Sequence, residues 1–133
     1  MRITREADYA LRIVAELSAE GKQLDAKLIS EKNDIPYRFT LKILRKLVQA
    51  GIVKSFRGVN GGYLLSKDPS EITLREVIET IDGKIAINKC FENPENCKNN
   101  GVCKVQKKLY GVQKIIAREL GSISFEDVLN EEV

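Results

Sequence analysis

An order of elements constrains the fold of this chain most: three short helical segments lead directly into a glycine-rich turn between two apolar stretches. Apolar residues recur at helical spacing over residues 4–19, and Thr4 is suited to cap that helix. Asp25 is suited to cap a shorter second helix that ends near Asn33. The first 33 residues therefore predict two helices joined by a tight connection.

The third helical segment, from Pro36 to about Ala50, has one apolar and one cationic face. Proline is favoured in the first turn of a helix, and Gly51 follows the expected end. The inner face carries Thr40, Ile43, Leu44 and Leu47. The opposite face carries Arg38, Lys42, Arg45 and Gln49, at positions i, i+4, i+7 and i+11.

Charge is concentrated around this third helix. The whole chain has a net charge of +3, but residues 34–57 contain six Lys or Arg residues and one acidic residue. Such a local excess is typical of a surface that faces phosphate. The alternative is an ordinary solvated helix face, which is what most runs of charge turn out to be.

Two strands, residues 52–56 and 63–65, are predicted around the loop RGVNGGY (residues 57–63). Three helices followed by a hairpin is the order of a winged helix-turn-helix, in which the third helix enters the major groove. We therefore predict a mainly α fold with a small β-hairpin wing that binds double-stranded DNA. The candidate DNA contacts are Arg38, Thr40, Leu41, Lys42, Arg45, Arg57, Asn60 and Tyr63. For Arg45 the alternative is solvation of the helix, and for Tyr63 it is a place in the strand core.

The second half of the chain predicts a capped fourth helix, a short extended piece and one long helix. Thr73 and Glu76 form a capping-box pattern, and residues 85–87 suggest the extended piece. A helix over residues 102–120 carries an apolar stripe of Val105, Leu109, Val112, Ile116 and Leu120. A small domain leaves little core for such a stripe to cover, so we predict a homodimer through this helix. Ser124 is suited to cap a last short helix. We place a DNA-binding unit in residues 1–82, and the cysteine loop and dimerisation helix in residues 83–133.

All three cysteines, Cys90, Cys97 and Cys103, lie together in an asparagine-rich stretch with the spacing C-x6-C-x5-C. The N-terminus has no signal-peptide pattern and no segment approaches the ~20 apolar residues of a membrane span, so we expect a cytoplasmic protein. In that compartment an odd number of cysteines favours metal or redox chemistry over disulfides. Thiolates suit iron–sulfur clusters, whereas structural zinc prefers four protein ligands, often in closer pairs. Metal-free redox-active thiols are the third alternative.

Together these motifs resemble the IscR/NsrR/CymR family of winged-helix regulators, the Rrf-two family. The resemblance rests on the start Met1 to Thr4, on Asp8 to Ala10, on the wing, on residues 72–81 and on the cysteine loop. It implies a homodimer whose long penultimate helix crosses its partner. In many members the cysteines hold an iron–sulfur cluster, either 2Fe-2S or 4Fe-4S. A symmetric dimer with two reading helices implies a near-palindromic operator.

The resemblance leaves the fourth cluster ligand open. In the IscR branch a histidine follows the third cysteine at +3, but here that position is Gln106 and the chain has no histidine. In the NsrR branch an aspartate near the N-terminus of the other subunit fills the role, and Asp8 matches that position. The alternative for Asp8 is a surface ion pair with Arg12, four residues further along the helix. The interval before Cys97 is one residue longer than in IscR, which leaves the cluster type open.

The same features weigh against other classes of function. Without histidine, no Ser/His or Cys/His nucleophile can form, so we do not expect an enzyme. A CymR-type repressor that senses redox state through cluster-free thiols is the main alternative. A winged domain that binds protein rather than DNA is the other. The signal, and the choice between repression and activation, do not follow from the residues.

Overall fold

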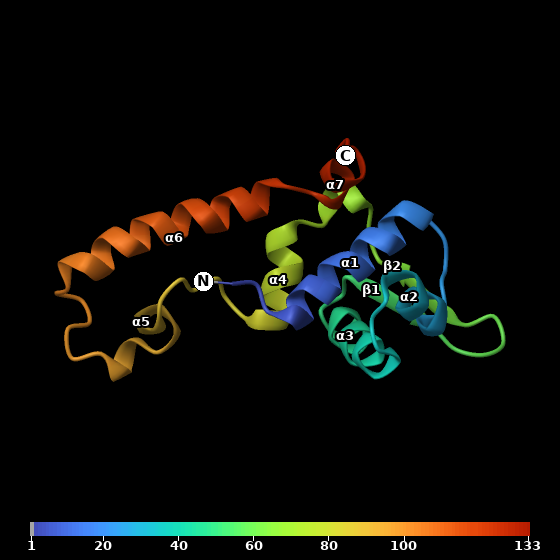
Figure 1. Cartoon of the computed structure of the whole chain (residues 1–133), viewed down its shortest axis with the longest axis horizontal. Coiled ribbons are helices and arrows are strands. Elements are labelled where there is room, and N and C mark those ends of the chain that lie inside the picture. The colour runs from blue at the N-terminus through green and yellow to red at the C-terminus, as the bar shows by residue number, and fades with distance from the viewer. Residues whose placement is uncertain (1) are drawn as a thin grey trace.

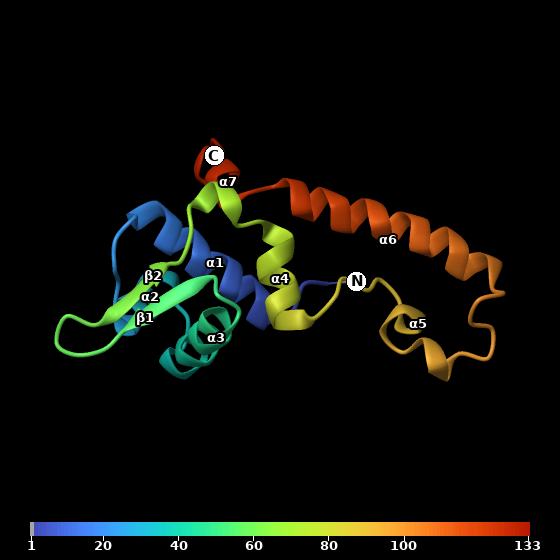
Figure 2. The same cartoon turned by 180° about the vertical axis from the view of Figure 1, so that it is seen from behind.

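The computed structural model describes residues 2–133, so Met1, part of the motif that carries the resemblance, lies outside the described residues. A body of short helices and a hairpin carries one long helical arm (Figure 1; seen from behind in Figure 2). The helices and strands are α1 (Arg5–Glu20), α2 (Ala26–Asn33), α3 (Tyr37–Gln49), β1 (Val53–Phe56), β2 (Gly62–Leu65), η1 (Pro69–Glu71), α4 (Leu74–Asp82), α5 (Lys89–Glu92), η2 (Pro94–Asn96), α6 (Lys104–Ser122) and α7 (Phe125–Leu129).

Side-chain caps set the bounds of the first helices, which agree closely with the prediction. The Thr4 hydroxyl accepts the N–H of Ala7 at 3.1 Å and begins α1. Asp25 caps α2 in the same way, and Asp34 ends that helix with a positive φ of 52°. Pro36 lies at the N-cap of α3, one residue before the predicted first turn, and its carbonyl accepts two backbone N–H groups.

The wing hairpin pairs with one further residue, a contact that the sequence did not predict. β1 and β2 pair antiparallel, with Val53 opposite Leu65. Leu24, between α1 and α2, pairs with Tyr63 on the other edge of β2 through two backbone hydrogen bonds of 3.0 and 2.7 Å. The close approach explains Gly62, because a Cβ at that position would lie 2.7 Å from the carbonyl oxygen of Leu24.

The core of the body includes the last helix of the chain. Phe125 is 1% exposed and belongs to the same apolar cluster as Leu44 and Val77. Its N–H donates to the carbonyl of Ile72 at 2.9 Å, and the N–H of Leu74 donates to that of Ile123 at 3.0 Å. The helix α7, which the prediction placed with the cysteine loop and the long helix, therefore packs on the same body as α1 and α4.

Two local predictions need correction. Residues 85–87 form no strand, and Ile87 instead donates its N–H to the side chain of Gln113 at 2.9 Å. The capping box at Thr73 is only half formed: its hydroxyl accepts the N–H of Glu76, but the Glu76 carboxylate pairs with Lys67 at 2.9 Å. The Glu76 side chain, which the pattern assigned to the N-terminal cap of α4, thus forms an ion pair with Lys67 instead.

The arm is α6, which leaves the body near α7 and extends past α4, with α5 beneath its far end (Figure 1). None of its residues is buried, and Val105 is 65% exposed. Leu109, Ile116 and Leu120 are half-buried. The predicted apolar stripe therefore exists, but one chain alone leaves much of it in water. Over residues 2–133, no helix combines the length and apolarity required to cross a bilayer.

Candidate DNA interface and cysteine pocket

The exposed face of α3 presents cations, and its buried face holds one of the predicted contacts. Thr40 is 0% exposed and its hydroxyl points back to the carbonyl of Pro36. It faces the core because it lies three residues before Ile43 and four before Leu44 on one side of the helix. The buried side chain of Thr40 is therefore not accessible to DNA, contrary to the prediction. Leu41 is half-buried against the core, so only part of its side chain is accessible.

Three predicted cations of α3 point outward. The guanidinium of Arg38 lies 5.1 Å from the centre of the Phe39 ring, within the range of a cation–π contact. Over residues 2–133, neither Arg38 nor Arg45 takes part in an ion pair within 4 Å. Lys42 is exposed but lies 3.7 Å from Glu6 of α1. Both arginines can therefore bind a nucleic acid without first losing an ion pair to an acidic side chain.

The wing loop lies on the same side of the body as α3, away from α7 (Figures 1 and 2). Arg57 and Asn60 are exposed in this loop, as predicted for groups that meet DNA. The side-chain amide of Gln23 donates to the carbonyl oxygen of Asn60 and ties the loop to the turn before α2. Tyr63 is half-buried against the core, which matches the alternative that placed it in the strand. The sequence did not predict this role of Gln23, because its hydrogen-bond partner lies 37 residues further along the chain.

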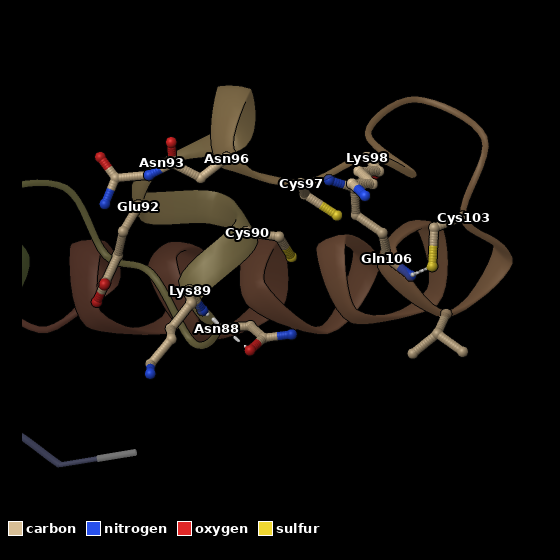
Figure 3. A pocket seen from close by; sticks show the side chains of 11 residues that line it. Asn88, Lys89, Cys90, Glu92, Asn93, Asn96, Cys97, Lys98, Cys103 and Gln106 are labelled. Atoms are coloured by element: carbon tan, nitrogen blue, oxygen red, sulfur yellow. Dashed lines mark hydrogen bonds between the residues drawn. The ribbon is translucent and has the colours of Figure 1, made fainter.

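The three cysteines line one cavity of about 700 Å³ at the far end of the arm (Figure 3). Cys90 lies in α5 rather than in a loop, Cys97 follows η2, and Cys103 is the N-cap of α6. All three are partly exposed free thiols. Over residues 2–133, no three His, Cys, Asp or Glu side chains already converge closely enough to hold a metal ion. Coordination of one metal centre by all three thiolates would require residues 90–103 to bring the cysteines closer together.

Gln106 holds the segment that carries the third cysteine. Its backbone N–H donates to the Cys103 sulfur at 3.4 Å. Its side-chain oxygen accepts the N–H of Gly101 at 3.2 Å, and its amide nitrogen donates to Asn100 at 3.1 Å. The side chain lies between Cys97 and Cys103 in Figure 3. The sequence singled out this position for its missing histidine, but not for this bracing role.

Asp8 lies on α1, and within one chain it does not line the cysteine cavity. Its carboxylate pairs with the Arg12 guanidinium at 3.2 Å, and its side chain is 49% exposed. The alternative interpretation of Asp8, a surface ion pair, is therefore present in the single chain. Ligation of a cluster by Asp8 would require a second copy of the chain and stays a prediction.

The geometry agrees with what comparison with known proteins finds. A family model described as "Rrf2: Iron-dependent Transcriptional regulator" matches residues 3–131. The chain belongs to the Rrf2 family. The predicted resemblance is thereby confirmed, and so is the assignment as a DNA-binding transcriptional regulator.

Individual relatives of this Rrf2 regulator support the same assignment. IscR of Photorhabdus laumondii is 31% identical over 134 residues, which cover 99% of this chain and 81% of the relative. NsrR of Bacillus subtilis is 34% identical over 106 residues, which cover 77% and 73%. These relatives are named as transcriptional regulators.

Solved structures confirm the fold. CymR, described as the global cysteine regulator of B. subtilis, superposes with a TM-score of 0.81 at 24% identity, over 100% of this chain and 99% of that one. IscR of T. potens superposes with a TM-score of 0.77 at 23% identity, over 98% and 87%. The predicted mainly helical fold with a hairpin wing is therefore confirmed.

Proposed function

We propose that this Rrf2 regulator is a homodimer that binds a near-palindromic DNA operator, and that an iron–sulfur cluster held by Cys90, Cys97 and Cys103 controls its affinity. The observation that carries the proposal is that every cysteine of the chain lines one cavity at the far end of the arm. The iron-dependent family description and the relatives named IscR and NsrR support it.

The chemistry of the cavity suits such a cluster. Thiolates are soft ligands, and a bound cluster would supply a redox-sensitive centre that responds to oxidants. Lys89 and Lys98 also line the cavity, and their positive charge compensates part of the negative charge of the thiolates. Turn hydrogen bonds, such as Asn100 N–H to the carbonyl of Cys97 at 3.2 Å, and the side chain of Gln106 hold the intervening residues. No residue of α5 or η2 is buried, so contraction costs little packing.

Asp8 of a second copy is our candidate for the remaining ligand. Its carboxylate is half exposed, and the exposed ion pair with Arg12 is its one competing interaction over residues 2–133. An exposed i, i+4 pair contributes only about 0.3–0.5 kcal/mol, so a metal bond would replace it readily. The side-chain amide of Gln106 is already committed to Gly101 and Asn100, which makes it the weaker candidate.

The exposed side chains of the arm support the dimer. Val105, Val112 and Ile115 are each about half exposed or more on α6. A second cavity of about 470 Å³ lies where Ile78 of α4 and Ile116 of α6 meet the start of the chain. Several exposed apolar side chains on one helix are typical of an interface between subunits.

The experiment is anaerobic reconstitution of the full chain with iron and sulfide. Each Cys→Ser variant is compared with wild type by absorption spectrum and by iron and sulfide content per dimer. Asn96→Ala is the matched control, because Asn96 lines the same cavity without a thiol. We expect the control to retain the cluster and each cysteine variant to lose it or to bleach rapidly in air. A cysteine variant with unchanged iron content and stability would refute the ligand assignment.

Asp8→Ala tests the fourth ligand in the same assay. We expect this variant to assemble a cluster that decays faster in air than the wild-type cluster, with altered DNA affinity. Arg12→Ala is its control, because it removes the ion-pair partner of Asp8 and leaves the carboxylate free. Decay of the Asp8→Ala cluster at the wild-type rate would assign the ligand to another group.

A thiol-responsive regulator of the CymR type is the second candidate. The observation in its favour is that all three cysteines are free and partly exposed. It predicts that metal-free protein changes its DNA affinity on oxidation with a disulfide and recovers with a thiol reductant. Retention of iron through anaerobic purification, with no response of the metal-free protein to oxidation, would exclude it.

A further inference from the structure

An acidic residue of α1 lies against the recognition helix. One carboxylate oxygen of Glu6 is 2.9 Å from the ammonium of Lys46 and 3.7 Å from that of Lys42. Glu6 is in the first turn of α1, where a negative side chain is also favoured by the helix dipole. One carboxylate thus serves two ammonium groups on the same stripe of α3.

The environment makes this contact more persistent than an isolated surface pair. Glu6 and Lys46 are both half-buried at the junction of α1 and α3, whereas Lys42 is exposed. The start of α1 is also fixed, because the Thr4 hydroxyl donates to the Asp82 carboxylate at 2.5 Å. Partly buried pairs are screened less by salt than exposed ones, so the Glu6 carboxylate offsets positive charge on the helix.

We propose that Glu6 limits the attraction of the recognition helix for DNA by competing with phosphate for Lys46 and Lys42. This inference rests on the proposed DNA binding and goes beyond it, since it assigns a role to an acid that touches no DNA. Lys46 stays paired with Glu6 and contributes little to phosphate binding. Arg38 and Arg45, which have no acidic partner among residues 2–133, dominate the contact instead.

The proposal differs from a purely structural role in one measurable quantity. A group that only braces α1 against α3 would change stability or overall affinity when removed. A group that neutralises a lysine also changes how many phosphates the protein contacts. The slope of log K against log salt concentration counts those contacts, at about 0.9 per phosphate.

The test measures binding of the full chain to a fluorescein-labelled mixed-sequence duplex of about 25 base pairs, which is somewhat more than two helical turns. The salt concentration is varied between about 50 and 200 mM. We expect Glu6→Gln to bind more tightly than wild type and to steepen the slope by about 0.9 for each subunit, which is about 1.8 for the dimer. The advantage of the variant should therefore shrink about twelvefold across this range of salt concentration. Glu126→Gln on α7 is the control, since it changes net charge equally on the opposite side of the body.

A second pair of variants keeps the test independent of the Glu6 substitution. Lys46→Gln should leave the slope unchanged in wild type, whereas Arg45→Gln should lower it by about one for each subunit of the dimer. In the Glu6→Gln background, Lys46→Gln should also lower the slope by about one for each subunit. Circular dichroism checks that each variant is folded.

Two results overturn the proposal. One is a Glu6→Gln slope equal to that of wild type in a folded protein that binds the duplex. The other is a loss of slope in Lys46→Gln as large as in Arg45→Gln. Failure of wild type to bind the duplex even at the lowest salt would instead refute the proposed DNA binding itself.

Discussion

Replacement of Phe125 by alanine tests whether α7 is part of the DNA-reading body. The side chain is 1% exposed, so folding removes on the order of 200 Å² of aromatic surface from water. At about 25 cal/mol per Å² this corresponds to about 5 kcal/mol. Alanine retains a small part of that burial and the cavity that it leaves adds a cost, so we expect a loss of about 3–5 kcal/mol.

The assay is urea unfolding followed by far-ultraviolet circular dichroism, with Leu129→Ala as the matched control. Leu129 lies in the same helix but is 42% exposed, so its truncation should cost less than about 1 kcal/mol. A typical domain is stable by only about 5–15 kcal/mol, so the loss at Phe125 should shift the midpoint strongly. Equal midpoints for the two variants would refute the assignment of α7 to the core.

Three further predictions follow from individual contacts. Gly62→Ala should weaken DNA binding and shift the wing resonances in NMR spectra, because its Cβ would lie 2.7 Å from the Leu24 carbonyl. Ile116→Glu should give monomers in sedimentation at concentrations where wild type forms dimers, since Ile116 is a half-buried member of the apolar stripe of α6 and lines the second cavity. The pKa of Glu20 is lowered from its ordinary value of 4.5 by a hydrogen bond from Lys32 and by its charge. That pair therefore stabilises the fold above about pH 4.5 and loses its effect as the pH falls through the lowered pKa. Glu20→Gln should accordingly flatten the acid side of the stability–pH profile, and an unchanged profile would contradict this.

The helices could be predicted because their signals are local. Thr4, Asp25, Thr73 and Ser124 each cap a helix through a backbone N–H no more than three residues away. A sequence pattern can register such contacts because they depend on short spacings. The same reasoning placed the wing hairpin around its glycine-rich loop.

Contacts between distant parts of the chain could not be predicted in the same way. The pairing of Leu24 with Tyr63 and the return of Phe125 to the core depend on tertiary packing, which carries no local periodicity. The sequence placed Thr40 both on the inner face of its helix and among the DNA contacts. The packing of α3 shows that its side chain is buried. The three cysteines could be recognised from the sequence because they lie in one segment. Gln23 could not, because it connects the turn before α2 to Asn60 in the wing loop.

The anchoring of α4 at both ends has a consequence for how such regulators diversify. The helix starts where Leu74 bonds to Ile123 and ends where Asp82 bonds to Thr4, so residues 83–122 leave and re-enter the body at the two ends of one short helix. In architectural terms that segment is an insertion into an otherwise complete domain. Insertions at such points tolerate exchange of sequence while the host domain keeps its own core. We therefore expect a chimaera that carries the 83–122 segment of another Rrf2 protein to keep the DNA preference of this body while acquiring the chemistry of the donor.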